Sequence, residues 1–409
     1  MHVVFFGDQH AESLGGAQVS MRLQRKYLER AGHTVTIVAP RMHSHRHASA
    51  ADPGYLDLPS IPITADREYA MTWPSRRTDL FLDRALAGRP PVDVVHVQAD
   101  FWGAFIGHRF AHRHGIPAVH TMHNRVDVGI AAVTPLHRPV LGALNAWRRT
   151  ALRGIGEQPR GNDGWAYLAG IAAESRAVTA PSGHFARRLE QHGVFGSVDV
   201  VWNGIDDEVR EKVLAAAPLR QAHGAERSPG RPRFVWLGRM SPEKRLLPFL
   251  EAVVASDIDA DVEIVGGGAQ RRAAERIAAR AGRPRIHFAG RIGYADVLAR
   301  IAAADAVVQT SIGFETQGMT PFEAATLGTP TVVSDPDIAA ELRGGLWAVP
   351  DAAADEKARV AALAETLRIA AADIGAGRAP EPDPQVAADF RQSSRTAAML
   401  GIYERALGR

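Results

Sequence analysis

The sequence predicts an α/β fold made of two doubly wound domains. Its 409 residues exceed the roughly 250–300 residues at which a single hydrophobic core stops growing. Short apolar runs alternate with helical patterns, which is typical of parallel βαβ units. The alternation stops in a stretch rich in Pro, Gly, Arg and Ala at 215–232 and then restarts. We therefore expect an N-terminal domain at 1–214, a linker at 215–232, a C-terminal domain at 233–388, and a helix at 389–409 that can return to the N-terminal domain.

The first domain begins with one complete βαβ unit. An apolar strand at 3–6 leads to a helix at 18–30 that places Val19, Leu23 and Tyr27 on one face. Gly32 ends this helix, and a second strand follows at 34–38. Further strands of this domain are expected at 92–97, 117–121, 177–180 and 199–202.

The second domain repeats the same alternation. Helices at 270–280 and 295–303 separate apolar runs of strand length. Ligands of open α/β sheets bind at the carboxyl ends of the strands, so two such domains in tandem predict a ligand cleft between their carboxyl edges. The strands of this domain are expected at 234–237, 262–265, 286–288, 306–309 and 331–334.

Composition excludes several classes of function. The chain contains no cysteine, which rules out disulfides, thiolate metal sites and cysteine nucleophiles and fits a reducing cytoplasm. A formal net charge of only +3 does not predict a nucleic-acid partner. The chain starts without a basic, signal-like segment and has no run of about 18 apolar residues. We therefore expect a cytoplasmic protein.

A pair of glycines lies between the first strand and the first helix. Gly15 and Gly16 would let backbone N–H groups approach a phosphate or a sugar oxygen at a helix N-terminus, although a tight turn explains them equally well. The loop is not a G-x-G-x-x-G motif, and the second strand ends without the acidic residue that binds the ribose of NAD. A nicotinamide cofactor is thus disfavoured, with Arg41 leaving NADP formally open.

Two cations follow the first strand of the second domain. Arg239 and Lys244 lie five residues apart on a turn in which Ser241 can cap a helix and Pro242 can start it. Both could converge on one anion, and a diphosphate is the natural candidate. Solvated surface charges are the alternative, but lysine is scarce here, with four residues among the 48 lysines and arginines.

The run from 313 to 328 contains two glutamates. Thr320, Pro321 and Glu323 match the N-cap, N1 and N3 positions of a capping box, which would explain Glu323 structurally. Glu315 has no such explanation. It lies beside Gly318 on a loop before a helix N-terminus, where N–H groups could hold a phosphate and a carboxylate could hold sugar hydroxyls.

These motifs, in this order, resemble the retaining GT-B glycosyltransferases of family 4. Glu315 and Glu323 lie eight residues apart and are followed by Gly-Thr-Pro-Thr-Val-Val, with Gly-Arg and Glu-Lys upstream and the glycine pair near the N-terminus. The resemblance spans about 1–340. It departs from the family at 325–327, where Ala-Thr-Leu stands in place of the frequent Ala-Met-Ala. Further matches lie at 93–97, 180–182 and 203–206.

The resemblance implies two Rossmann-like domains facing across a cleft, and a role for each motif. Arg239 and Lys244 would neutralise the diphosphate of a UDP- or GDP-hexose, Glu323 would hold the ribose, and Glu315 would hold the hexose. His123, at the end of a strand, matches the active-site histidine of the family. The implied donor-binding set is Gly15, Gly16, Arg239, Lys244, Gly318, Met319, Thr320 and Glu323, and the implied catalytic residues are His123 and Glu315.

We expect neither a metal nor a cofactor. The aspartates at 257, 259 and 261 resemble the D-x-D motif of metal-dependent glycosyltransferases, but they precede a strand at a common solvated loop position. His43, His45 and His47 lack partners for a closed metal site. Arg239, Lys244 and a helix N-terminus can already neutralise the charge for which Mg²⁺ would be needed.

The acceptor is predicted least sharply. A basic amphipathic stretch at 137–155 could lie on anionic lipids at the inner face of the membrane, or it could be an ordinary surface helix. The sequences at 120–123 and 315–320 resemble forms seen in family members that glycosylate diacylglycerol-type lipids. A lipid, a glycan or a small glycoside therefore remains open as the acceptor. A GT-B sugar-nucleotide epimerase, a phosphorylase and a non-catalytic nucleotide-sugar binding protein are the rival functions.

Overall fold

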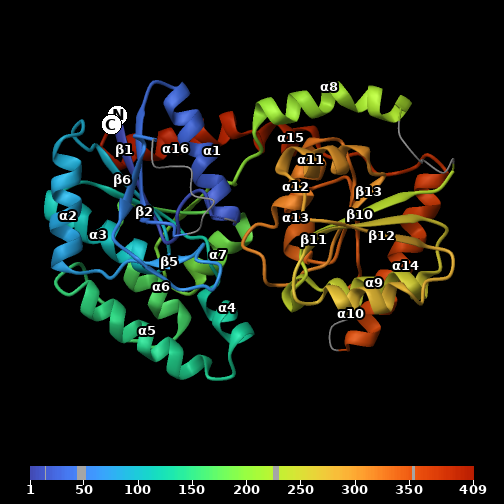
Figure 1. The fold of residues 1–409 in the computed structure, drawn as a ribbon, viewed down its shortest axis with the longest axis horizontal. Helices are drawn as coiled ribbons and strands as arrows, with labels where there is room; N and C mark the ends of the chain where they lie inside the picture. Colours follow the sequence, from blue (N-terminus) through green and yellow to red (C-terminus); the bar gives the residue numbers. More distant parts are fainter. Residues whose placement is uncertain (14, 44–51, 224–229, 352–354) are drawn as a thin grey trace. The chain divides into compact units, whose positions relative to one another are not determined.

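The chain folds into two compact units, each with its own parallel sheet (Figure 1). Unit 1 comprises Met1–Gly204 and Gln392–Arg409, and unit 2 comprises Ile205–Arg391. The structure, a computed structural model, describes residues 1–13, 15–43, 52–223, 230–351 and 355–409.

Unit 1 is a doubly wound sheet with strand order β3-β2-β1-β6-β7-β8-β9. The order reverses between β1 and β6, where ligands of such sheets bind. β1 is buried along its whole length and pairs in parallel with β2 and β6, which is why it reads as a continuous apolar run. The strands are β1 (His2–Gly7), β2 (Thr34–Pro40), β3 (Tyr55–Leu58), β6 (Val94–Gln98), β7 (Ala118–Thr121), β8 (Ala177–Ala180) and β9 (Val198–Val200), with a separate hairpin of β4 (Ile61–Pro62) and β5 (Ala70–Met71).

Helices cover both faces of this sheet. The C-terminal helix belongs to unit 1, where the Tyr403 hydroxyl lies 2.6 Å from Nδ1 of the buried His96 in β6. No helix in the described ranges is long and apolar enough to cross a membrane. The helices are α1 (Gly16–Arg30), α2 (Arg76–Ala87), α3 (Trp102–His114), α4 (Val126–Val133), α5 (His137–Ala151), α6 (Gly164–Ala172), α7 (Gly183–Gln191) and α16 (Gln392–Ala406).

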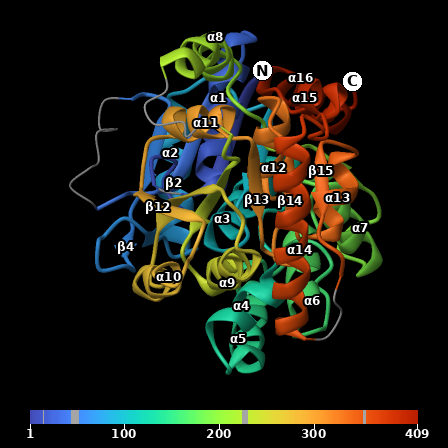
Figure 2. The same ribbon diagram turned by 90° about the vertical axis from the view of Figure 1, so that its right-hand side faces the viewer.

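Unit 2 is a six-stranded parallel sheet with the order β12-β11-β10-β13-β14-β15. Helices α9, α10 and α14 lie on one face and α11, α12 and α13 on the other (Figures 1 and 2). The helices that connect successive strands are placed as right-handed crossovers require. The strands are β10 (Arg233–Arg239), β11 (Asp261–Gly267), β12 (Arg285–Gly290), β13 (Ala306–Gln309), β14 (Thr331–Val333) and β15 (Leu346–Ala348). The helices are α8 (Asp207–His223), η2 (Pro242–Lys244), α9 (Leu246–Ser256), α10 (Arg271–Ala278), α11 (Tyr294–Ala303), α12 (Met319–Thr326), α13 (Pro336–Leu342), α14 (Glu356–Gly375) and α15 (Pro384–Asp389).

The linker predicted at 215–232 is wrong over its first half. Residues 215–223 continue α8, which starts at Asp207 and belongs to unit 2, and the boundary between the units falls after Gly204. Three consecutive alanines at 215–217 favour helix. Arg210 also ties α8 to unit 2, because its Nε donates to the Thr326 carbonyl at 3.1 Å. Residues 224–229 of the predicted linker lie outside the described ranges.

Candidate functional site

The turn after β10 presents Lys244 as the sequence predicts. Pro242 is the first residue of the 3₁₀-helix η2, and the Lys244 N–H closes the turn on the Ser241 carbonyl at 3.1 Å. The next residue, Arg245, has a positive φ of 55° and begins α9. The Lys244 carbonyl accepts a hydrogen bond of 2.7 Å from the Thr310 hydroxyl, which anchors the turn to the end of β13.

Lys244 and Glu315 form the centre of the site in unit 2. The ammonium of Lys244 lies 2.5 Å from Glu315 Oε1, and the Ser311 hydroxyl donates to the same oxygen at 2.7 Å. Burial favours the neutral carboxyl, but the Lys244 charge and these two hydrogen bonds outweigh it, so the pKa of Glu315 is lowered. The structure therefore brings together one predicted phosphate ligand and one predicted sugar ligand.

Arg239 contributes from a more exposed position. Its side chain is 73% exposed, and Nη2 lies 3.4 Å from Glu243 Oε1, which also accepts a 2.5 Å bond from Ser241. The Arg239 charge still lowers the pKa of Glu315. The two predicted cations thus lie at one edge of the sheet, with Arg239 the more exposed of the two.

The capping box predicted for the next helix is wrong. Helix α12 begins at Met319, and its N-cap is Gly318 with a φ of 73°, so Thr320 lies inside the first turn and caps nothing through its side chain. A Cβ at position 318 would come within 2.6 Å of Ile338 Cδ1, so glycine fits both the backbone and the packing. The first backbone N–H groups of α12, those of Met319 and Thr320, receive no side-chain cap from Gly318. Glu323 therefore loses the structural explanation that the capping box offered.

Glu323 is buried on α12 beside Tyr294, the first residue of α11. It is 6% exposed, and burial raises its pKa to about 7, an effect that the nearby Tyr294 hydroxyl partly offsets. The Tyr294 hydroxyl is itself buried and faces Glu323, without a second hydrogen-bond partner in the described part of the chain. Burial, followed by the charge of Glu323, raises the pKa of this tyrosine. A buried carboxyl and a buried hydroxyl of unit 2 thus lie together.

The glycine pair lies at the carboxyl end of β1 in unit 1. Gly15 is the N-cap of α1 with a φ of 157°, and Gly16 is the first helical residue. This agrees with the predicted strand-to-helix loop. Leu14 lies outside the described residues.

His123 follows β7 and is held through its backbone. Its N–H donates to Asp100 Oδ2 at 3.2 Å, and the Asn124 side chain donates to the same oxygen at 2.6 Å. Burial lowers the pKa of His123 to about 4, so the ring is neutral at neutral pH. A neutral imidazole can donate or accept a hydrogen bond but carries no charge to a substrate.

Two buried aspartates beneath this loop escaped the sequence analysis. Asp8 follows β1 and accepts backbone N–H groups of Asp100 at 2.7 Å and Gly103 at 2.9 Å. Burial raises the pKa of Asp8 to about 6, and burial together with the Asp8 charge raises that of Asp100 to about 7. Their only signal in the sequence is that each comes shortly after a buried strand. Tyr294 and Ser311 were also missed, and nothing in the sequence marked them.

The residues of the rejected metal alternatives have other partners. Asp259 and Asp261 both pair with Arg231, and Asp257 accepts the Arg283 N–H at 3.1 Å. His43 lies 3.0 Å from the Ser60 hydroxyl, while His45 and His47 fall outside the described residues.

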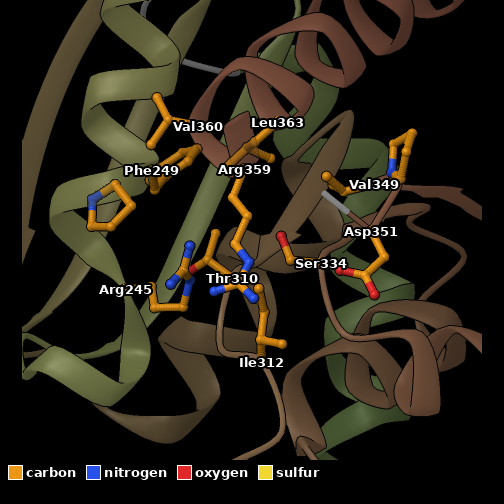
Figure 3. Close-up of a pocket in the computed structure, with 12 residues that line it drawn as sticks. Arg245, Phe249, Thr310, Ile312, Ser334, Val349, Asp351, Arg359, Val360 and Leu363 are labelled. Atoms are coloured by element: carbon orange, nitrogen blue, oxygen red, sulfur yellow. The ribbon is translucent and has the colours of Figure 1, made fainter. Parts of the chain in front are cut away.

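A pocket of unit 2 adjoins the Lys244 turn from behind (Figure 3). Arg245 and Arg359 extend into it, and both pair with Glu356 of α14. Thr310, which holds the Lys244 carbonyl, also lines it. None of the predicted site residues lines this pocket, so it lies beside the turn and is not the predicted donor site.

Sequence comparison matches both halves of the chain to glycosyltransferase profiles. Residues 14–209 match Glycosyltransferase Family 4, and residues 231–369 match Glycosyl transferases group 1. The chain is 26% identical over 339 residues to a GDP-mannose-dependent alpha-(1-6)-phosphatidylinositol dimannoside mannosyltransferase of Mycobacterium tuberculosis, covering 82% of this chain and 79% of the relative. It is 24% identical to an alpha-monoglucosyldiacylglycerol synthase of Streptococcus pneumoniae, covering 81% of this chain and 70% of that enzyme.

Structural comparison gives the same class of fold. The crystal structure of Anabaena Alr3699/HepE in complex with UDP and glucose matches with a TM-score of 0.63 at 15% identity, covering 99% of this chain and 100% of that chain. The pneumococcal O-GlcNAc transferase GtfA in complex with UDP and GlcNAc matches with a TM-score of 0.65 at 10% identity, over 100% and 99% of the two chains. The predicted GT-B fold, with two Rossmann-like domains, is confirmed.

Proposed function

Because the chain belongs to glycosyltransferase family 4 and is a glycosyltransferase, we propose that it transfers a hexose from UDP- or GDP-hexose to an acceptor hydroxyl with retention of configuration, without a metal or a cofactor. The observation that carries this proposal is the Lys244–Glu315 pair at the carboxyl edge of the unit 2 sheet. A cation and a carboxylate, held on one turn and one loop, offer a ligand for a diphosphate next to a ligand for sugar hydroxyls.

Donor binding would exchange the partners of this pair. The ammonium of Lys244 turns to the diphosphate, and the Glu315 carboxylate accepts hydrogen bonds from the hexose. Arg239 is exposed and can swing onto the same diphosphate. As the bond to the hexose breaks, negative charge grows on the departing diphosphate, and these fixed cations stabilise it.

The nucleoside end of the donor would lie at α11 and α12. Glu323 can accept both ribose hydroxyls, and the buried Tyr294 hydroxyl can supply a hydrogen bond beside it. The backbone N–H groups of Met319 and Thr320 at the start of α12 favour a phosphate. From unit 1, Gly15 and Gly16 would approach the phosphate and sugar, and the neutral His123 would hydrogen-bond to the sugar near the reacting bond.

The proposed metal independence rests on protein groups that can balance the negative charge of the diphosphate. Lys244, Arg239 and the α12 N-terminus can together balance a diphosphate. The aspartates at 257, 259 and 261 are used by Arg231 and by a backbone N–H. We therefore expect turnover to persist in excess EDTA.

Turnover of a panel of nucleotide sugars tests the proposed function. Purified protein should release UDP or GDP from one donor and form a new glycoside whose anomeric configuration, read by NMR, matches that of the donor. An inverted product would overturn retention. Interconversion of sugar nucleotides without any acceptor would favour the epimerase, and tight donor binding without turnover would favour the non-catalytic binding protein.

For the acceptor, we favour a glycolipid at the membrane surface. The names of the two relatives compared above each contain a glycolipid, phosphatidylinositol dimannoside in one and monoglucosyldiacylglycerol in the other. In unit 1, Trp73 is 57% exposed and stacks on Trp147 of α5 with ring centroids 5.1 Å apart. Leu80 and Phe81 on α2 are also exposed and share a shallow depression with Arg77 and Arg84. We call Trp73, Arg77, Leu80, Phe81, Arg84, Leu136 and Val140 the α2–α5 surface; its exposed apolar groups and cations suit an anionic bilayer at the inner membrane face.

One cation of the basic stretch at 137–155 is unavailable to a membrane. Arg148 is fully buried and donates to the carbonyls of Ala166 and Pro159, so it holds α5 against α6 and the loop before it. Arg149 is half-buried and bonds to Gly161 and Asn162. Arg138 remains exposed near the N-terminus of α5.

A further inference from the structure

The loop that carries Glu315 is held by a buried glutamine that the proposed reaction does not use directly. Gln309 is the last residue of β13 and is 7% exposed. Its Nε2 donates to the Ser311 carbonyl at 2.7 Å and to the Ser311 hydroxyl at 2.9 Å. Its Oε1 accepts the N–H groups of Ser334 at 3.2 Å and Asp335 at 3.3 Å. Both ends of the carboxamide are therefore engaged.

The direction of these hydrogen bonds fixes the proton of Ser311. A serine hydroxyl has one proton to donate. Because Gln309 donates to the Ser311 oxygen, that proton is left for Glu315 Oε1, which it meets at 2.7 Å. The same carboxylate oxygen receives the Lys244 ammonium. The Gln309 amide and the Glu315 carboxylate are thus linked through one hydroxyl.

A second support comes from Asp335, the N-cap of α13, which follows the adjacent strand β14. Asp335 Oδ2 accepts the Gly313 N–H at 2.7 Å, while Oδ1 accepts the Asp337 N–H at 2.9 Å and caps α13. The loop from 310 to 315 is hydrogen-bonded at Ser311 by Gln309 and at Gly313 by Asp335. These two groups are themselves linked, because Gln309 accepts the backbone N–H of Asp335. A shift of the whole loop would break the hydrogen bonds at both Ser311 and Gly313.

We infer that Gln309 is a positioning residue that acts through Ser311 to set the Glu315 carboxylate for the hexose of the donor. This inference rests on the proposed function, because it takes Glu315 as the hexose ligand. It concerns the hexose and not the nucleotide, since the chain of hydrogen bonds ends at Glu315. Its loss should lower kcat and leave the affinity for the free nucleoside diphosphate almost unchanged.

The test compares Gln309→Met, Ser311→Ala and a control, Thr329→Val. Methionine keeps the length of the glutamine but cannot hydrogen-bond as it does. Ser311→Ala removes the hydroxyl that links Gln309 to Glu315 and keeps the bond from Gln309 to the Ser311 carbonyl. The Thr329 hydroxyl is buried and donates to the Ile301 carbonyl at 2.9 Å, at the amino end of β14 and away from the Glu315 loop. Each variant is assayed for hydrolysis of UDP-glucose and GDP-mannose and for binding of UDP and GDP by calorimetry.

We expect Gln309→Met and Ser311→Ala each to lower kcat by about 10- to 100-fold, as for a lost hydrogen bond to a charged group. Affinity for UDP or GDP should change by less than about threefold, and Thr329→Val should match the wild type. In the Glu315→Gln background, Gln309→Met should cause almost no further loss, because both changes act on one contact.

Multiplicative losses in the Glu315→Gln background would overturn the inference, as would an equal loss of UDP or GDP affinity. Ser311→Ala keeps the inference testable if Gln309→Met fails to fold, because full activity of Ser311→Ala would also overturn it. A wild type that neither binds nor hydrolyses any nucleotide sugar would refute the proposed function itself. A wild type that is active alongside active Gln309 and Ser311 variants refutes only the role of Gln309.

Discussion

The two units handle charge in opposite ways at the carboxyl edges of their sheets. In unit 2, Glu315 is kept ionised by Lys244, so the pair is charged and ready to change partners. In unit 1, burial raises the pKa of Asp8 and Asp100 and lowers that of His123, so these groups favour their neutral forms. A charged pair suits a diphosphate that must be bound and released, whereas buried carboxyls that accept backbone N–H groups suit the shaping of a loop. The carboxyl edge of a parallel sheet can therefore present a charged pair to a ligand or hold a loop in place.

The largest effect should come from replacing Lys244, because the substitution removes the cation of the Lys244–Glu315 pair. Lys244→Ala is expected to lower kcat/KM for the donor by about 100- to 1000-fold, as for removal of one fixed donor to a developing anion. Calorimetry should show a large loss of affinity for UDP or GDP and a small loss for uridine or guanosine. Lys357→Ala, at an exposed position of α14, is the control. Equal losses for nucleoside and diphosphate would remove Lys244 from the phosphate site.

Glu323 allows a buried carboxyl of unit 2 to be compared with the exchanging carboxylate of Glu315, because Glu323 is buried like the carboxyls of Asp8 and Asp100 in unit 1. Glu323→Gln is expected to weaken UDP or GDP binding by about 10-fold or more through the ribose. The folded-state pKa is raised to about 7 from 4.5, so the wild type loses stability as pH rises between these values. The variant should therefore unfold at a higher temperature than the wild type at pH 8, with little difference near pH 4.5.

The control for this variant is Glu365→Gln, because Glu365 is exposed on α14. It should show neither the loss of nucleotide affinity nor the pH-dependent gain in stability. Full nucleotide affinity of Glu323→Gln would leave Glu323 without a role at the ribose.

The outer surfaces of the two units should also differ. Wild-type protein is expected to sediment with phosphatidylglycerol vesicles at low salt and less so at high salt or with phosphatidylcholine alone, because exposed charges are screened within about 8–10 Å. Phe81→Ser together with Arg84→Ser should reduce binding by about 10-fold and leave UDP or GDP affinity intact. Ile369→Ser, an exposed apolar position of unit 2, is the matched control. Wild-type protein that stays in the supernatant at low salt would favour a soluble acceptor.

The smallest effect is expected at Asp100, whose raised pKa of about 7 already favours the neutral carboxyl below neutral pH. Asp100→Asn keeps an oxygen for the N–H groups of His123 and Asn124 and removes the cost of ionising a buried carboxyl. With a folded-state pKa of about 7 against 3.8, the wild type loses stability as pH rises through this window. The variant should gain about 1 kcal/mol in the free energy of unfolding at pH 8 and nothing near pH 4, as measured by urea titration. A loss at pH 8 would show that Asp100 is needed as a carboxylate.

The fold could be predicted from the sequence because its strands are buried on both faces. The runs at 3–6, 34–38 and 234–237 are apolar throughout and became β1, β2 and β10 with shifts of one or two residues at their ends. Short edge strands such as β15, which has three residues, carry too little pattern to be recognised. The error at 215–232 arose because proline and glycine outweighed three alanines that in fact extend α8.

Part of the site could also be predicted. Arg239, Lys244 and Glu315 were identified from residue type and loop position, and the structure brings Lys244 and Glu315 into contact across 71 residues. The prediction of a capping box failed because a glycine with a left-handed backbone, Gly318, caps α12 two residues before Thr320. The sequence motif alone could not reveal that Ile338 packs where a side chain at 318 would lie.

What the sequence determined by itself are the α/β alternation, the glycine and proline turns, and the positions of the charged residues along the chain. These depend on local backbone preferences and on the periodicity of apolar residues. Only the tertiary structure decided which groups are charged. Asp8 and Asp100, 92 residues apart, share one buried site, and Gln309 at the end of β13 reaches Asp335, the N-cap of α13. Burial and electrostatic neighbours set a pKa, and both come from segments that are distant in the sequence.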